Sequence, residues 1–184
     1  MQNVRNTILG AALLAPVLVV PANAAEGWYG KVSIGQNINT EVSGIQLNDD
    51  MTYGAAVGTA VGPVRVEAGV DRVAGDLNLG FASVQANALD WSVTGYLDLP
   101  VGDNASVFGG LGVGYIDAEA NAFGTTIDGS GTEWHYAVGG AYRLNDRLIV
   151  EAQYRHTEAD SISTDFGDVD LSFDAVTAGF RLAL

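Results

Sequence analysis

Few residues of this chain have the types and spacing that enzymatic chemistry requires. The sequence contains no cysteine, which excludes disulfides, thiolate metal sites and cysteine nucleophiles. His156 is followed by Thr157 and Glu158, so no serine stands two residues after this histidine, and Ser161 and Ser163 have the wrong spacing. A catalytic triad needs a nucleophile beside its base. The sequence therefore predicts a protein that is not an enzyme.

Metal and cofactor sites are not indicated either. Asp165, Asp168 and Asp170 form a cluster of carboxylates, and carboxylate oxygens are ligands of Ca²⁺. Their spacing does not match a 12-residue calcium loop and the terminal glutamate is missing, so a solvated acidic loop is the preferred interpretation. His135 falls on a row of residues predicted to face the protein interior, where we expect it to make a structural hydrogen bond.

The first 24 residues have the layout of a secretory signal peptide. Arg5 is the only charged residue among them, an apolar run extends from Ile8 to Val20, and the small residues Ala22-Asn23-Ala24 follow. The apolar run is too short to span a bilayer comfortably as a helix. We therefore expect a signal peptide over residues 1–24 and a single domain over residues 25–184.

Apolar and polar residues alternate after the signal peptide, in short stretches that Gly, Asn and Asp interrupt. Period-two alternation is typical of strands, and it marks eight segments: 27–35, 51–61, 64–72, 89–99, 105–116, 133–144, 147–156 and 173–184. Long and short connections alternate strictly between them, as in outer-membrane barrels. The long loops are expected at 36–50, 73–84, 117–132 and 157–170. We predict an all-β fold, an eight-stranded antiparallel up-and-down transmembrane β-barrel in which the last strand pairs with the first.

Alternation alone does not say which row of residues meets lipid, because a soluble barrel such as a lipocalin places its apolar row inside. The aromatic residues of the apolar row gather toward the two ends of the strands, as interfacial girdles do. The predicted girdle consists of Trp28, Tyr53, Tyr115, Trp134, Tyr136, Tyr142, Tyr154 and Phe180. The opposite row is rich in small residues that suit the inside of a narrow barrel. The apolar row is therefore predicted to face lipid.

The polar row carries ten charged side chains, five of each sign. They are Lys31, Arg65, Arg143, Arg155 and Arg181 together with Glu67, Asp71, Asp90, Asp98 and Glu151. A buried charge that lacks a partner costs several kcal/mol. We therefore expect a paired polar network inside the barrel, with Glu151 and Arg181 on adjacent strands as one of its pairs.

The remaining charge is strongly acidic. The chain has 8 basic and 22 acidic residues, and removal of Arg5 with the signal peptide leaves 7 − 22 = −15. Most of the acidic residues lie in or beside the four predicted long loops. A surface of this sign disfavours nucleic acid and other polyanions as partners.

Several local motifs occur in the order expected of one barrel family. Gly27-Trp28-Tyr29 opens the barrel, Val66-Glu67-Ala68-Gly69 lies in the third strand, glycines alternate from Gly110 to Gly114, and the segment from Glu151 to Thr157 precedes the last loop. Together with the signal peptide and the terminal strand, these motifs make the chain resemble the small outer-membrane barrels of the OmpA-like, opacity-protein and porin-family group. The resemblance covers the whole mature chain.

This resemblance implies a location in the outer membrane of a Gram-negative cell envelope, in contact with outer-membrane lipid and lipopolysaccharide. It also implies assembly by the outer-membrane insertion machinery with periplasmic chaperones, which read an assembly signal in the last strand. Here that signal would be Phe180, Leu182 and Leu184. The family usually ends on Phe, whereas this chain ends on Leu.

Three functions are open at this point, because a fold alone does not decide function. The first is a non-enzymatic protein that acts through its acidic surface loops in adhesion or envelope integrity, with an unknown surface ligand that the apolar loop residues Ile45, Leu47, Phe123 and Phe166 could contact. The second is a narrow porin for small solutes or ions, although side chains about fill the interior of an eight-stranded barrel. The third, a lipid-modifying enzyme, is disfavoured because the nucleophile is missing.

Overall fold

The structure is a computed structural model that describes residues 27–42, 45–46, 51–78, 83–122, 125–164 and 167–184. The predicted signal peptide and the loop residues Leu47, Phe123 and Phe166 lie outside these ranges. Across the described part of the chain, no helix has the length and hydropathy needed to cross a membrane.

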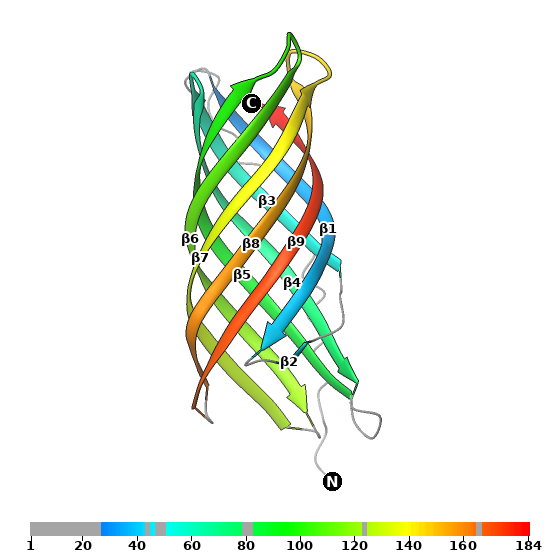
Figure 1. The fold of residues 1–184 in the computed structure, drawn as a ribbon, viewed down its shortest axis with the longest axis vertical. Helices are drawn as coiled ribbons and strands as arrows, with labels where there is room; N and C mark the ends of the chain where they lie inside the picture. Colours follow the sequence, from blue (N-terminus) through cyan, green and yellow to red (C-terminus); the bar gives the residue numbers. More distant parts are fainter. Residues whose placement is uncertain (1–26, 43–44, 47–50, 79–82, 123–124, 165–166) are drawn as a thin grey trace.

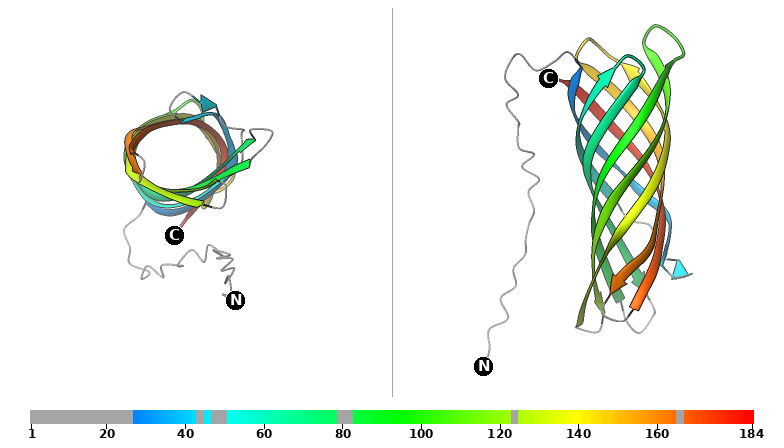
Figure 2. Two further views of the ribbon diagram at one scale, coloured as in Figure 1. Left: turned by 90° about the horizontal axis from the view of Figure 1, so that it is seen from below. Right: turned by 90° about the vertical axis from the view of Figure 1, so that its left-hand side faces the viewer.

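Eight long antiparallel strands form one closed barrel (Figures 1 and 2). They are β1 (Trp28–Val42), β3 (Met51–Val61), β4 (Val64–Asn78), β5 (Ser83–Pro100), β6 (Ala105–Ala122), β7 (Thr125–Arg143), β8 (Leu148–Thr164) and β9 (Gly167–Ala183). Each strand pairs with the next, and β1 also pairs with β9. A short strand, β2 (Ile45–Gln46), pairs with the end of β1. The predicted eight-stranded antiparallel barrel is confirmed.

Closure of the barrel depends on the seam between the first and last strands. The β1–β9 pairing runs from Tyr29 opposite Ala183 to Val42 opposite Leu171. The backbone N–H of Leu184 also donates a hydrogen bond to the carbonyl of Trp28, 3.0 Å away. No strand edge of the membrane-level wall therefore remains unpaired, as spanning a bilayer requires.

The strands extend further than the alternation of apolar residues predicts. The β4–β5 ladder continues to Asn78 opposite Ser83, the β6–β7 ladder to Ala122 opposite Thr125, and the β8–β9 ladder to Thr164 opposite Gly167. The predicted loops at 73–84, 117–132 and 157–170 are thus mostly sheet, and part of the loop at 36–50 belongs to β1 and β2. The backbone pairing of the strands continues beyond the membrane level, whereas the row of apolar residues on the outer face ends there.

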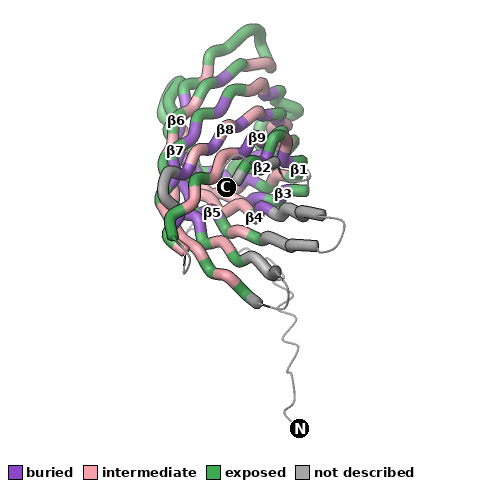
Figure 3. Tube along the Cα trace, turned by 60° about the horizontal axis from the view of Figure 1, so that its bottom comes forward, coloured by how far each residue is buried: buried purple, intermediate pink, exposed green. Residues whose placement is uncertain are grey.

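Buried and more exposed residues alternate along the strands, as the tube coloured by burial shows (Figure 3). The large exposed hydrophobic residues lie on the outer face, for example Val113 at 65% and Leu111 at 71% exposure. Most of the buried charged residues lie on the opposite row. This inversion of the usual apolar-inside arrangement is what a membrane-spanning barrel requires.

Two glycines of β1 provide a test of the packing at the β1–β9 seam, because they lie in the same strand but have different surroundings. A Cβ added at Gly35 would overlap the carbonyl oxygen of Val176 in β9 and lie 2.7 Å from Thr177 Cα, whereas a Cβ at Gly30 would meet nothing within 4 Å. Gly35→Ala should lower the free energy of unfolding by about 1–3 kcal/mol because it overpacks the seam. Gly30→Ala should change it by less than about 0.5 kcal/mol. Urea unfolding of the refolded barrel measures both, and equal stability of the two variants would contradict this view of the seam.

Candidate functional site

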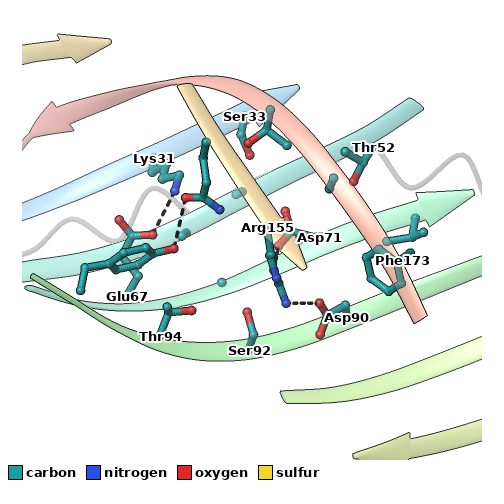
Figure 4. Close-up of a pocket in the computed structure, with 18 residues that line it drawn as sticks. Lys31, Ser33, Thr52, Glu67, Asp71, Asp90, Ser92, Thr94, Arg155 and Phe173 are labelled. Carbon is teal, nitrogen blue, oxygen red and sulfur yellow. Dashed lines mark hydrogen bonds and ion pairs between the residues drawn. The ribbon is translucent and has the colours of Figure 1, made fainter. Parts of the chain in front are cut away.

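The interior of the barrel holds two clusters of charged side chains, one toward the short turns and one toward the opposite end. We call that opposite end the outer end, because short turns face the periplasm in outer-membrane barrels. The turn-end cluster consists of Lys31, Arg65, Glu67, Asp98, Glu151 and Arg181. The outer interior cluster consists of Asp71, Asp90, Glu133, His135 and Arg155. Figure 4 shows members of both around the cavity that separates them.

Lys31 connects opposite sides of the turn-end cluster. Lys31 Nζ lies 2.6 Å from Glu151 Oε1 and 3.1 Å from Glu67 Oε2, so it bridges carboxylates from β8 and β4. Arg181 Nε of β9 lies 2.8 Å from Glu151 Oε2, the pair expected from the sequence. All four side chains are at most 9% exposed.

Arg65 completes the turn-end cluster from β4 and is fully buried. Its Nη1 contacts Glu67, and its Nε donates to Asp98 Oδ2 at 2.8 Å. The guanidinium also stacks on Tyr96 of β5, 3.8 Å from the ring centroid, and lies 4.7 Å from the ring of Phe108 in β6. Contacts of this kind between a cation and aromatic faces strengthen when water is excluded. Three positive and three negative side chains thus meet across the lumen.

Arg155 of β8 is the centre of the outer interior cluster. It reaches Asp90 at 2.5 Å, Asp71 at 2.9 Å and Glu133 at 3.5 Å. His135 Nδ1 lies 2.9 Å from Glu133 Oε1, while the other ring nitrogen lies 2.8 Å from the hydroxyl of Thr94, which confirms a structural hydrogen-bonding role for this histidine. One arginine therefore faces three carboxylates.

The cavity between the two clusters is small. Its volume is about 40 Å³, enough for a few water molecules, and Lys31, Glu67, Asp90 and Arg155 are among its lining residues (Figure 4). Toward the outer end, an interior apolar cluster follows, formed by Val73, Ile116, Ala159, Ile162 and Phe173. Side chains therefore occupy the lumen at three successive levels.

The structure changes the charge balance expected from the alternating rows. Arg143, placed by the alternation on the interior row, is exposed, because it ends β7 where the barrel opens to water at the turn end. Glu133, which borders a predicted loop, is instead 4% exposed inside the barrel because β7 begins earlier than expected. The two clusters together then hold four basic residues against six carboxylates rather than five of each sign.

The interior contains groups that the sequence reasoning missed. Tyr29 donates a hydrogen bond from its hydroxyl to Glu67 at 2.8 Å, and Tyr96 and Phe108 pack edge-to-face at 5.7 Å between ring centroids. These aromatic residues share the polar, inward row of their strands, so their position in the alternation is the signal that was available. Among the described residues, no group of three or more His, Asp or Glu side chains is arranged to hold a metal ion.

The predicted girdle residues lie on the outer wall. Tyr154 is half-buried. The other seven are exposed, namely Trp28, Tyr53, Tyr115, Trp134, Tyr136, Tyr142 and Phe180. Trp91 joins them, opposite Tyr115 in the β5–β6 ladder. The three residues of the expected assembly signal, Phe180, Leu182 and Leu184, are exposed as well.

A closed barrel with an apolar outer wall and a charged, filled interior defines a transmembrane β-barrel of the small type. The chain belongs to the outer membrane protein beta-barrel domain family, whose profile matches residues 8–182. The protein is therefore an outer-membrane barrel. A comparison with curated proteins finds no match to this chain.

Solved structures share this architecture at low sequence identity. Neisserial surface protein A is 12% identical over 88% of this chain and 99% of its own, with a TM-score of 0.71. Ail, the attachment invasion locus protein of Yersinia pestis, is 19% identical over 86% of this chain and 100% of its own, with a TM-score of 0.53. OprG from Pseudomonas aeruginosa is 13% identical over 86% of this chain and 96% of its own, with a TM-score of 0.57. At these identities the likeness concerns the fold.

Arg155 offers the sharpest test of the interior network. Arg155→Met should lower the free energy of unfolding by about 3–5 kcal/mol, because it leaves three interior carboxylates without their cation. Arg143→Met is the matched control, since the same change at an exposed arginine should cost less than about 0.5 kcal/mol. Urea unfolding followed by tryptophan fluorescence measures both. If the two variants were equally stable, Arg155 would not hold this cluster together.

Proposed function

We propose that this protein is a non-conducting and non-catalytic outer-membrane protein that acts at the cell surface, in adhesion or envelope integrity. The observation that carries the proposal is the occupied lumen. The turn-end cluster joins side chains of β1, β4, β8 and β9 across the barrel, and the interior apolar cluster lies beyond it. A barrel filled in this way acts through its outer end and its wall rather than through a pore.

The outer end of the barrel supplies an anionic surface for such contacts. The exposed acidic residues that the structure describes there include Glu41, Asp117, Glu119, Asp128, Asp168 and Asp170. They stand on extensions of the barrel strands, so the sheet holds them in defined positions beyond the outer girdle. Electrostatic complementarity favours cationic partners and disfavours nucleic acid.

The negative charge of this chain does not suit a polyanionic ligand, such as the one found with a structural neighbour. Ail from Yersinia pestis has been crystallised in complex with sucrose octasulfate, a heparin analogue; that structure is 18% identical to this chain, with a TM-score of 0.56. With a net charge of −15 in the mature chain, this protein is suited to a ligand of the opposite sign.

A narrow porin is the alternative function. The polar cavity of about 40 Å³ between the two interior clusters favours it, because a wet cavity is one part of a conducting path. The cavity is bounded by the turn-end cluster on one side and by Val73 and Phe173 of the interior apolar cluster on the other. Conduction would require ion pairs on one side and packed apolar side chains on the other to separate, so we favour the non-conducting function.

The proposal includes the maturation of the protein. Residues 1–24 act as the signal peptide, and the last strand is read during assembly through Phe180, Leu182 and Leu184. Periplasmic chaperones and the insertion machinery would be transient partners. Lipid and lipopolysaccharide would be the lasting partners of the exposed outer wall.

Two matched pairs of acidic residues test the role of the outer end. Asp117→Asn with Asp128→Asn neutralises exposed acids of β6 and β7 there, whereas Asp103→Asn with Asp146→Asn makes the same change in exposed turns at the other end. The outer pair should lower protein-dependent adherence of expressing cells to a cationic surface by about 2- to 10-fold at low salt, because fewer charges attract that surface. The turn-end pair should leave adherence unchanged.

Adherence is measured against cells that lack the protein, on cationic and neutral surfaces and over a range of salt concentrations. Equal effects of the two pairs would contradict a role for the outer end, and so would the absence of protein-dependent adherence on both surfaces.

A further inference from the structure

A cluster of polar side chains lies on the outer wall of the barrel, separate from the interior network. Asp174 of β9 accepts hydrogen bonds from Asn39 Nδ2 of β1 at 3.0 Å and from the hydroxyl of Tyr154 in β8 at 2.8 Å. Nδ1 of His156, also in β8, lies 2.7 Å from Asp174 Oδ1. Arg155, between Tyr154 and His156, is buried inside the barrel, so these two side chains point outward. We call this set the outer-wall cluster.

An irregular backbone brings Asn39 to this cluster. Asn39 has a φ of 54°, the single positive φ of a non-glycine residue among those described, and the register between β1 and β9 shifts between Ile38 and Glu41. A β-bulge re-aims a side chain. Here Asn39 is exposed, while Asn37 and Thr40 on either side are buried. The wall thus departs from regular pairing at the position where the amide meets Asp174.

Two aromatic rings of β7 continue the outer-wall cluster. The ring of Tyr136 lies 5.1 Å from that of His156 at an interplanar angle of 34°, and the ring of Trp134 lies 6.3 Å from that of Tyr136 at 33°. Trp134 is 42% exposed and Tyr136 is 37% exposed. The rings of Trp134 and His156 lie 6.4 Å apart at 67°, so the three rings form one contiguous aromatic group that ends at the polar side chains.

Nδ1 of His156 faces Asp174, so a ligand of this histidine would meet the other ring nitrogen, Nε2. Nδ1 lies within hydrogen-bond distance of the Asp174 carboxylate, and an imidazole that carries its single proton on Nδ1 has an acceptor at Nε2. The Asp174 carboxylate is within hydrogen-bond distance of Asn39, Tyr154 and His156. These contacts fix the orientation of the histidine ring. The cluster therefore presents an acceptor beside aromatic rings, an arrangement suited to a group with hydroxyl donors and an apolar face.

The level of the cluster on the wall identifies which molecules reach it. Trp134, Tyr136 and Tyr154 belong to the girdle at the outer interface, where aromatic side chains sit at the height of lipid headgroups. On the turn side, the next outward positions are the exposed apolar residues Val138 and Val176. Short turns face the periplasm in outer-membrane barrels, so at this opposite end the neighbours of the cluster are the headgroups of the outer leaflet.

We propose that the outer-wall cluster binds a sugar ring of an outer-leaflet glycolipid, such as a sugar of lipopolysaccharide. The apolar face of the ring lies on Trp134 and Tyr136, and a sugar hydroxyl donates to Nε2 of His156. Asp174 and the nearby Glu158 make the surface unfavourable for phosphate, so the bound group is an uncharged part of the headgroup. The proposal rests on lipopolysaccharide as the proposed partner of the wall and does not depend on the adhesion or envelope role proposed for the outer end.

Native mass spectrometry of the refolded barrel tests this proposal. The protein is placed in bilayer nanodiscs that contain equal amounts of a diglucosyl diacylglycerol and a phosphatidylcholine with the same acyl chains, and the lipids that remain bound are counted. The wild type should retain the glycolipid about 5-fold over the phospholipid, the size expected of a hydrogen bond and ring contacts. Trp134→Leu and His156→Phe should each return the ratio to about 1, the second because it keeps a ring but removes the acceptor.

Tyr142→Leu is the matched control, since it removes an exposed aromatic residue from the girdle at the turn end and should leave the ratio as in the wild type. Folding of every variant is checked by its heat-modifiable electrophoretic mobility, and Tyr136→Leu replaces Trp134→Leu if that variant does not fold. A wild-type ratio of about 1 would overturn the proposal. Wild-type enrichment that persists in the folded variants of the cluster would overturn it as well.

Discussion

The constraint on which this structure depends is the need to pair charged side chains inside a barrel that excludes most water. A charge buried alone costs several kcal/mol, whereas a charge with a partner and hydrogen bonds is tolerated. Lys31 meets this need by bridging carboxylates of two strands on different sides of the lumen, and Arg65 by pairing with Asp98 while it stacks on Tyr96. The ion pairs that satisfy the charges are also contacts that fill the lumen. The same side chains therefore stabilise the folded barrel and block its interior.

The same wall has two different outer surfaces, and they suit different neighbours. At membrane level the outward residues are apolar and end in aromatic girdles, which suits lipid. Beyond the outer girdle the strands continue with exposed acidic residues such as Asp117 and Asp128. The interior apolar cluster of Val73, Ile116, Ala159, Ile162 and Phe173 lies behind this part of the wall.

The barrel could be predicted from the sequence because period-two alternation indicates strands. The aromatic residues also indicate where each strand crosses the membrane interface. The prediction placed the strand ends too early, since alternation of apolar residues stops at the lipid boundary while backbone pairing continues to Asn78, Ala122 and Thr164. That error placed Glu133 at the first position of a predicted strand, where it was counted with the acidic residues that border a loop, and its contact with His135 was missed. The bulge that turns Asn39 outward follows from local φ and register, which a pattern of residue types does not report.

Single-channel recording of the refolded protein in a planar bilayer tests most directly the claim that paired charges and packed side chains close the lumen. Insertion is verified independently by protease protection of the barrel. Our account predicts no discrete openings from inserted wild-type protein, because the turn-end cluster and the interior apolar cluster occupy the path. Discrete and reproducible openings of the wild type would contradict it.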